Sequence, residues 1–236
     1  MKDILSAIRQ ELKEQSDAAT RQSFQRFFKE KVTGYGVKTA TVRKIAQKYF
    51  KEVRPLGKKG IFALCEDMLR TDHMEESAIA FEWAYRLKGE YEPEDFALFE
   101  GWLKKYVDNW AKCDSLCNHA IGSFVEEYPR FIENLKRWTK SKNRWLRRAA
   151  AVTLIVPAKE GKFLSEIFQI ADSLLLDEDD LVQKGCGWLL KEASRLHQQE
   201  VLGYVLRNKN KMPRTALRYA IEKMPPDLKE RAMAKE

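Results

Sequence analysis

Apolar residues recur at three- and four-residue steps along almost the whole chain, and this spacing constrains the fold most strongly. Such steps place side chains on one face of an α-helix, whereas a half-buried strand needs strict alternation. The segments AVTLIVP and SLLLD have strand-like compositions but continue helical patterns. The pattern therefore predicts helices over residues 2–14, 18–31, 40–51, 58–70, 73–88, 94–108, 115–128, 130–140, 144–156, 162–176, 180–196, 198–208, 214–223 and 226–234.

Residues that start and stop helices stand between these segments. A proline near the start of a helix costs little stability, because the first N–H groups of a helix have no partner within it and the N–H that proline lacks is not missed. The prolines placed in this way are Pro93, Pro129, Pro213 and Pro226. Candidate amino-terminal caps, whose side chains accept a backbone N–H, are Asp17, Asp72, Asn143 and Asp180.

The connections between helices are short, so successive helices should be antiparallel neighbours. They alternate in pairs with a period of roughly 35 to 45 residues, the range of HEAT-like repeats. Such repeats bury their apolar faces only by stacking. We therefore predict an all-α fold, an α-α superhelix of antiparallel helix pairs with a concave basic face, as a single domain over 1–236. A compact helical bundle is the alternative.

Composition limits the class of protein. A chain of 236 residues can bury a substantial core without disulfides, and 44% hydrophobic with 33% charged residues is typical of a soluble globular protein. No apolar run approaches the ~20 residues of a membrane span. The first residues, MKDILSAIRQELKEQ, mix charges on a helical period, which does not fit a signal peptide. We expect a cytoplasmic protein that does not interact with a membrane.

The four cysteines do not follow the spacing of a zinc finger or ribbon. Cys113 and Cys117 could share a helical face with His119 nearby, which leaves a metal site as an alternative. Small buried thiols in a reducing compartment are the commoner case. We expect neither a metal nor a cofactor.

The net charge of +8 is unevenly distributed. Between Glu66 and Glu100 there are eleven acidic and three basic residues, a local balance of −8, so the remaining segments carry +16. Segregated charge suggests a basic surface for a polyanion and an acidic surface away from it. The alternative is a mixed, solvated surface.

The segment NRWLRRAAAVTLIV places Arg144, Arg147 and Arg148 at the start of a predicted helix. A cation at this end interacts unfavourably with the helix dipole, and each one costs ~0.3–1 kcal/mol of helix stability. A bound anion would remove the conflict, since backbone N–H groups and guanidinium groups would converge on it. The alternative is that these arginines pair with acidic neighbours.

Two further basic clusters lie at predicted helix ends. The turn GYGVKT, which contains Lys38, precedes the first cluster, and a turn before residue 214 holds the second. Contacts of this kind to a duplex backbone supply affinity and salt dependence but read no sequence. Each cluster could also be an ordinary solvated helix end. The residues are Arg43, Lys44, Lys48 and Lys51, and then Arg207, Lys209, Lys211, Arg214 and Arg218.

Trp110, Asp114 and Trp188 are candidate functional residues with ordinary alternatives. Asp114 could be a helix cap, and both tryptophans could pack in the core. Gly185 and Gly187 closely precede Trp188 inside a helical pattern, where each costs ~1 kcal/mol relative to alanine. Glycine at these positions suggests a close approach, either by another helix or by a ligand backbone.

Four segments of the chain, GYGVKTATVRK, NWAKCDSL, NRWLRRAA and QKGCGWLLKE, resemble the AlkD-type family of DNA alkylation repair proteins, which are glycosylases built from HEAT-like repeats. The similarity covers nearly the whole chain. It implies that Trp110, Asp114 and Trp188 line a catalytic cleft and that Arg148 binds phosphate. Phe27 stands where close relatives have a tyrosine, so a hydroxyl contact to DNA is missing.

The resemblance implies a DNA glycosylase of base excision repair, acting as a monomer on double-stranded DNA with N3- or N7-alkylated purines. A cationic purine leaves without a general acid, and the sugar becomes oxocarbenium-like. Asp114 would stabilise that charge and orient water, while Trp110 and Trp188 would add cation–π stabilisation of ~0.5–2 kcal/mol each. The family grips the DNA backbone and need not enclose the base. Alternatives are a non-catalytic repeat protein that binds distorted or branched DNA and a protein-binding scaffold.

Overall fold

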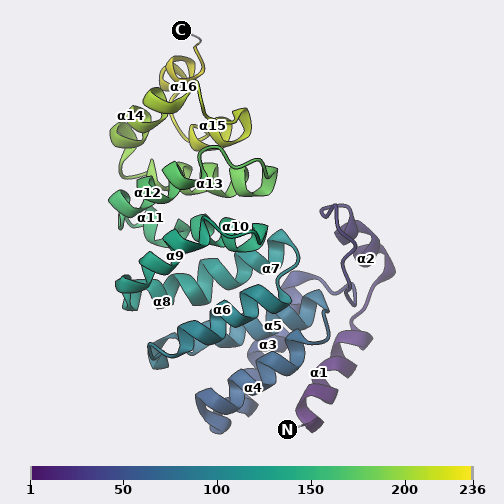
Figure 1. Ribbon diagram of the computed structural model, residues 1–236. Coiled ribbons are helices and arrows are strands. Elements are labelled where there is room, and N and C mark those ends of the chain that lie inside the picture. The colour runs from purple at the N-terminus through teal and green to yellow at the C-terminus, as the bar shows by residue number, and fades with distance from the viewer. Residues whose placement is uncertain (1, 235–236) are drawn as a thin grey trace. The chain divides into compact units, whose positions relative to one another are not determined.

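The computed structural model describes residues 2–234, and helices dominate this range (Figure 1). The described residues contain no β-strand, only an isolated bridge between Thr33 and His73. The all-α prediction is confirmed. Within the same range, none of the helices has the length and apolar character needed to cross a membrane.

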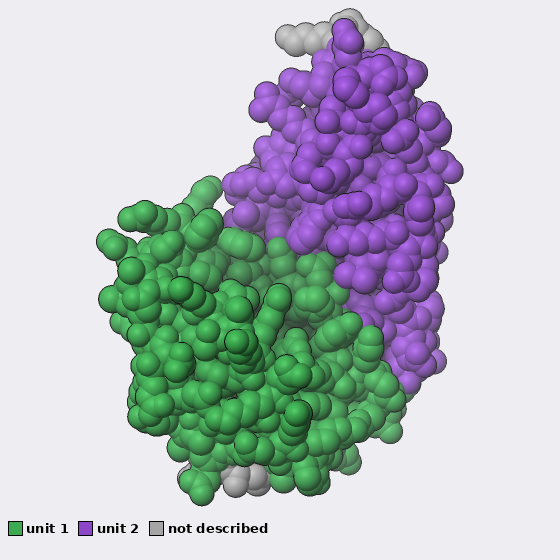
Figure 2. Space-filling view, turned by 180° about the vertical axis from the view of Figure 1, so that it is seen from behind, with its two compact units in different colours: residues 1–120 green, residues 121–236 purple. Residues whose placement is uncertain are grey.

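The chain divides into two compact units, Met1–Ala120 and Ile121–Glu236, which Figure 2 shows in separate colours. The expectation of one continuous repeat domain over 1–236 stays a prediction.

Unit 1 is built around three packed helices, of which α5 contacts both α3 and α4. Its core is rich in large aromatic side chains, with Phe81, Trp83, Phe99 and Trp102 almost completely buried. The rings of Phe99 and Trp102 pack against each other at 5.7 Å between centroids. The α-helices of this unit are α1 (Lys2–Glu14), α2 (Ala18–Gln25), α3 (Thr39–Val53), α4 (Gly57–Leu69), α5 (Met74–Arg86), α6 (Asp95–Tyr106) and α7 (Trp110–Ser115).

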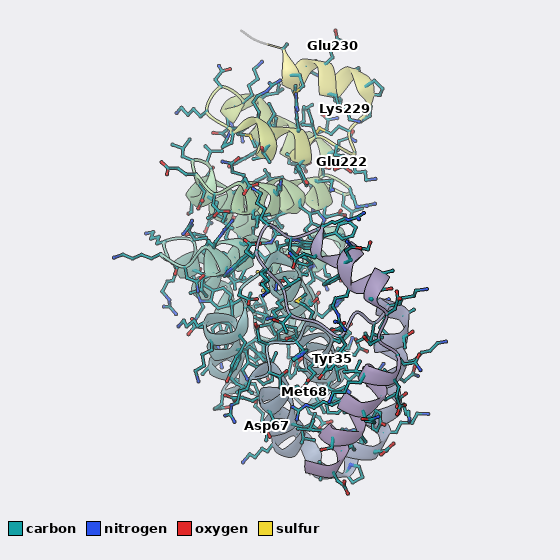
Figure 3. All side chains as sticks on the ribbon, turned by 90° about the vertical axis from the view of Figure 1, so that its right-hand side faces the viewer. Tyr35, Asp67, Met68, Glu222, Lys229 and Glu230 are labelled. Carbon is teal, nitrogen blue, oxygen red and sulfur yellow. The ribbon has the colours of Figure 1, made fainter. Side chains whose placement is uncertain are left out.

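A buried carboxylate fixes the turn that leads into α3. Glu75 accepts the backbone N–H groups of Tyr35, Gly36 and Val37 at 2.8–3.0 Å. Gly36 has a φ of +85°, and a Cβ there would lie 2.6 Å from the carbonyl oxygen of Asp17, so only glycine fits. Tyr35, labelled in Figure 3, donates its hydroxyl to Glu76 at 2.8 Å. The start of α3 is therefore held rigidly against α5.

Unit 2 is held together by α13, which packs against α10, α11, α12 and α15. Short 3₁₀ turns and a π-helix connect the α-helices along the chain, with the π-helix Leu116–Ile121 joining α7 to α8. The helices of this unit are α8 (Gly122–Glu127), α9 (Ile132–Trp138), α10 (Arg144–Val152), α11 (Ile155–Lys159), α12 (Leu164–Leu174), α13 (Asp180–Ala193), α14 (Gln198–Asn208), α15 (Arg214–Ala220) and α16 (Pro226–Met233).

Two glycines of α13 permit close helix packing. A Cβ on Gly187 would lie 2.5 Å from Cβ of Tyr219 and 2.6 Å from the carbonyl oxygen of Ala216, both on α15. A Cβ on Gly185 would lie 3.3 Å from Val152 on α10. Of the two explanations for these glycines, the approach of another helix is the one that the structure supports.

The predicted caps are confirmed at two of four positions. Asp17 caps α2 and Asn143 caps α10, each accepting a backbone N–H. The prediction for Asp180 is wrong by one residue, because Asp179 accepts the N–H groups that begin α13. The prediction for Asp72 is also wrong: this residue has a left-handed φ of +62°, and α5 begins two residues later.

Candidate functional site

Helix α7 presents Trp110 and Asp114 one turn apart, and both side chains are partly exposed. Residues four apart lie on the same helix face. The side chain of Asn109 accepts the N–H of Lys112 at 3.0 Å and so caps the helix. Asp114 lies inside the helix, so its interpretation as an ordinary cap is wrong, and its carboxylate lies on the same face as the indole.

The indole of Trp110 is held by the segment that follows α2. Its ring stacks on Phe28 at 5.2 Å between centroids, with 17° between the ring planes. Its Nε1 donates to the carbonyl oxygen of Phe27 at 3.3 Å. The side chain of Phe27 is 69% exposed, so this aromatic ring lies at the surface beside the held tryptophan.

A buried lysine fixes α7 on its other side. Lys112 is only 3% exposed, and its ammonium group forms ion pairs with Asp72 and with Asp108, the latter at 3.0 Å. The π-helix begins directly after α7. Such helices are rare in proteins, and many of those that occur lie at functional sites. Lys112 and Asp72 had no signal in the sequence pattern, because the pairing joins residues forty positions apart.

The basic cluster at the start of α3 is exposed. Lys38, Arg43 and Lys44 lie at the surface, and none of them forms an ion pair with any residue between 2 and 234. Lys48 differs, because it pairs with Glu11 at 2.7 Å. Exposed cations without carboxylate partners are the ones that a phosphate backbone can recruit at the lowest cost.

In unit 2 the arginines of α10 face acidic residues from the turn before α13. Arg144 lies 2.7 Å from Asp179, and Arg147 lies 2.6 Å from Asp177. Arg148 is 5% exposed and donates to the carbonyl oxygen of Leu181. For Arg144 and Arg147 the alternative weighed from the sequence, pairing with acidic neighbours, describes the structure. These carboxylates also relieve the conflict with the helix dipole.

Trp188 is half-buried on α13, and its indole Nε1 donates to Glu192 at 3.2 Å. Glu192 is itself buried and forms an ion pair with Arg195. Glu192 was not among the residues predicted from the sequence, although its position four residues after Trp188 places it on the same face. The tryptophan therefore has a fixed indole nitrogen and a partly exposed ring.

The second basic cluster of unit 2 surrounds the start of α15. Arg207, Lys211, Arg214 and Arg218 are exposed, and Lys209 donates to the carbonyl oxygen of Ala234 at 3.1 Å. Of the predicted residues, unit 1 holds Phe27, Trp110 and Asp114 together, whereas Arg148 and Trp188 belong to unit 2. Arg148 also contacts the α13 surface, since a Cβ on Gly185 would lie 3.5 Å from its side chain.

All four cysteines are buried. Cys113 and Cys117 are among them, and within residues 2–234 no group of three histidine, cysteine or acidic side chains could hold a metal ion. Burial raises the pKa of the Cys186 thiol to about 12 and raises that of Cys65 further. Such thiols are poor nucleophiles and poor ligands at neutral pH.

Comparisons with known proteins give the family and the fold. The sequence matches the family described as DNA alkylation repair enzyme over residues 8–224. A solved structure with a similar fold is described as a predicted DNA alkylation repair enzyme from Enterococcus faecalis, with a TM-score of 0.79, 17% identity, and coverage of 90% of this chain and 98% of that one. No curated protein matches the sequence. Because the family match spans most of the chain, the protein belongs to the DNA alkylation repair enzyme family.

Proposed function

We propose that the protein is a DNA glycosylase that hydrolyses the N-glycosidic bond of N3- and N7-alkylated purines in duplex DNA. The observation that carries the proposal is the pairing of Trp110 and Asp114 on one face of a helix that is capped and pinned on both sides. The family assignment supports a role in alkylation repair.

The chemistry needs one well-placed carboxylate. An alkylated purine is already cationic, so it leaves as a neutral base when the bond from its ring nitrogen to C1′ breaks. The electron pair of that bond goes to the base, and positive charge develops on the sugar. The carboxylate of Asp114 stabilises this charge and orients a water molecule, which adds to C1′ and loses a proton. The products are a free base and an abasic site.

An aromatic residue of unit 1 acts on the same sugar. The face of an indole attracts a cation by ~0.5–2 kcal/mol, and we assign this role to Trp110. The stacking of Trp110 on Phe28 holds its ring in place before the substrate arrives. The exposed ring of Phe27 would contact the DNA without the hydroxyl bond that a tyrosine offers.

Phosphate contacts are assigned to the exposed cations Lys38, Arg43, Lys44 and Arg214. We do not assign a primary phosphate contact to the arginines of α10. A phosphate would have to replace Asp177 and Asp179 as the partner of Arg147 and Arg144, and it would have to reach the buried guanidinium of Arg148. Their main contribution is to hold α10 against the start of α13.

The test is release of 7-methylguanine from methylated duplex DNA by the purified protein in the presence of EDTA. Wild-type protein should release the free base and leave an abasic site. Asp114→Asn should keep the DNA affinity and lose at least 100-fold in rate, because it removes the stabilising charge. Asp67→Asn, on the exposed surface of α4, is the matched control and should behave as wild type. Binding without release by the wild-type protein would instead support a non-catalytic DNA-binding role.

A further inference from the structure

Unit 1 contains a cavity of about 240 Å³ that the proposed glycosylase chemistry does not use. Helices α3 and α5 form much of its wall, and α7 contributes Ala111, Lys112 and Ser115. Trp110 and Asp114 lie on the same helix but do not line the cavity. The cavity is therefore a separate feature beside the candidate catalytic face.

One part of the cavity is apolar. Phe24, Val42, Ala46 and Phe81 line it, so the wall offers two aromatic rings and aliphatic carbon. Aromatic and apolar side chains are the surfaces on which enzymes hold a planar base outside the helical stack. This wall suits a flat heterocycle.

Another part of the cavity suits an anion. Thr39 is the first residue of α3, a helix of 15 residues that begins without a side-chain cap. Arg43 follows one turn later, lines the cavity, and has no ion pair with the part of the chain that the structure describes. Backbone N–H groups at a helix start together with a guanidinium group favour a phosphate.

The carboxylates that border the cavity are already engaged. Glu75 accepts three backbone N–H groups from the turn before α3, and Glu82 pairs with Arg86 at 2.8 Å. Their charge is therefore partly balanced by these donors. The positive charge of Arg43 therefore attracts an anion to the start of α3.

A second, independent observation points to a ligand. Ser77 is 1% exposed and lines the cavity, yet its hydroxyl oxygen has no hydrogen-bond partner among the residues described. Buried hydroxyls almost always have a partner, so this one is available to donate to or accept from a bound molecule.

We propose that this cavity binds a nucleoside monophosphate unit. The base lies against Phe24 and Phe81 with its polar edge toward Ser77, and the phosphate lies at Thr39 and Arg43. The unit comes either from a free mononucleotide or from a nucleotide extruded from a DNA strand. The inference goes beyond the proposed glycosylase activity, because the site can be occupied whether or not a base is released.

The first experiment measures the binding of dAMP, deoxyadenosine and inorganic phosphate to the full chain by ligand-detected NMR and calorimetry. We expect dAMP to bind at least tenfold more tightly than deoxyadenosine or phosphate, because it engages both ends of the cavity. Equal binding of dAMP and deoxyadenosine would overturn the phosphate assignment. Displacement of dAMP by octanoate at equal concentration would indicate an acyl-chain site and overturn the proposal.

Variants locate the binding. Ala78 lines the cavity at an exposed position, so Ala78→Trp should fill it and lower dAMP affinity at least tenfold without loss of folding. Ala63→Trp, at an exposed position on α4, is the matched control. Ser77→Ala and Arg43→Gln should each weaken dAMP binding severalfold. Unchanged dAMP affinity in Ala78→Trp and in Arg43→Gln would refute the site.

A duplex with a single 2-aminopurine separates the two sources of the nucleotide. Increased fluorescence on binding that is lost in Ala78→Trp but kept in Ala63→Trp supports a nucleotide extruded from the strand. Binding of dAMP with no fluorescence change supports a free mononucleotide. Absence of both signals contradicts the inference. Release of 7-methylguanine, measured in parallel, tests the proposed glycosylase separately.

Discussion

Gly187→Ala probes the helix packing that positions the surface around Trp188. The new methyl group would lie 2.5 Å from Cβ of Tyr219 and 2.6 Å from the carbonyl oxygen of Ala216. One of these atoms is backbone and the other is next to backbone, so neither can rotate away, and α15 must shift. Overpacking of this kind costs about 1–3 kcal/mol.

Helix propensity acts in the opposite direction, because alanine is favoured over glycine inside a helix by about 1 kcal/mol. Both contacts of the new methyl group are well below 3.0 Å, so the overpacking cost lies in the upper part of its range, at about 2–3 kcal/mol. We therefore expect Gly187→Ala to lower the free energy of unfolding by a net amount of about 1–2 kcal/mol. Gly185→Ala is the matched control on the same helix. A Cβ on Gly185 would lie 3.3 Å from Val152 and 3.5 Å from the flexible side chain of Arg148, so the gain in helix propensity should roughly offset the crowding.

Urea denaturation followed by circular dichroism measures both variants against the wild-type protein. The expected order of stability is wild type close to Gly185→Ala, with Gly187→Ala clearly lower. A Gly187→Ala variant as stable as the wild type would refute the close packing of α13 on α15, and it would reopen the other explanation for this glycine, the approach of a ligand backbone.

Three further predictions concern charge and protonation. Replacing Lys38 and Lys44 with glutamine should weaken DNA binding and reduce the slope of log K against log salt by roughly 1.8, at about 0.9 per lost phosphate contact. An unchanged slope in a salt titration would exclude these two lysines as contacts. Cys65 and Cys186 should not react with a thiol reagent in the folded protein at pH 8, because burial raises the pKa of both thiols. Both should react once the protein is unfolded in urea. Rapid labelling of the native protein would contradict their burial. The Tyr106 hydroxyl donates to the Glu66 carboxylate at 2.9 Å and lowers the pKa of that carboxyl. The stability that this bond contributes is present above the unfolded-state pKa of Glu66 and is lost as the pH falls through the folded-state value, so Tyr106→Phe should destabilise the protein more at pH 7 than at pH 3. An equal loss at both pH values in thermal melts would refute this coupling.

The helical periodicity predicted most elements, and the differences have local causes. The helix expected over 18–31 ends at Gln25, because the side chain of this residue donates to the carbonyl oxygen of Glu30 and accepts the N–H of Val32. These bonds stabilise a turn instead of a further helical turn. The helix expected over 144–156 is interrupted near Thr153, where the ring of Pro157 would clash with the carbonyl group four residues earlier.

Trp110 and Asp114 were identified through the family resemblance, but their shared helix face was not predicted. The helices expected over 94–108 and 115–128 left residues 109–114 in a connection, whereas α7 spans Trp110–Ser115. The partners of Arg144 and Arg147 come from residues 177–179, thirty or more positions away, so the choice between a phosphate and a carboxylate partner could not be made from the sequence. The buried pair of Lys112 with Asp72 could not be predicted for the same reason.

The most direct test of the proposed function is the single-turnover rate of 7-methylguanine release by the wild-type protein and by Asp114→Asn, at enzyme concentrations that saturate the DNA. Saturation removes any difference in affinity, so the rates compare the chemical step alone. We predict measurable release by the wild-type protein and a rate at least 100-fold lower for the variant, a loss of about 2.7 kcal/mol of transition-state stabilisation. Equal rates for the two proteins would contradict the assignment of Asp114.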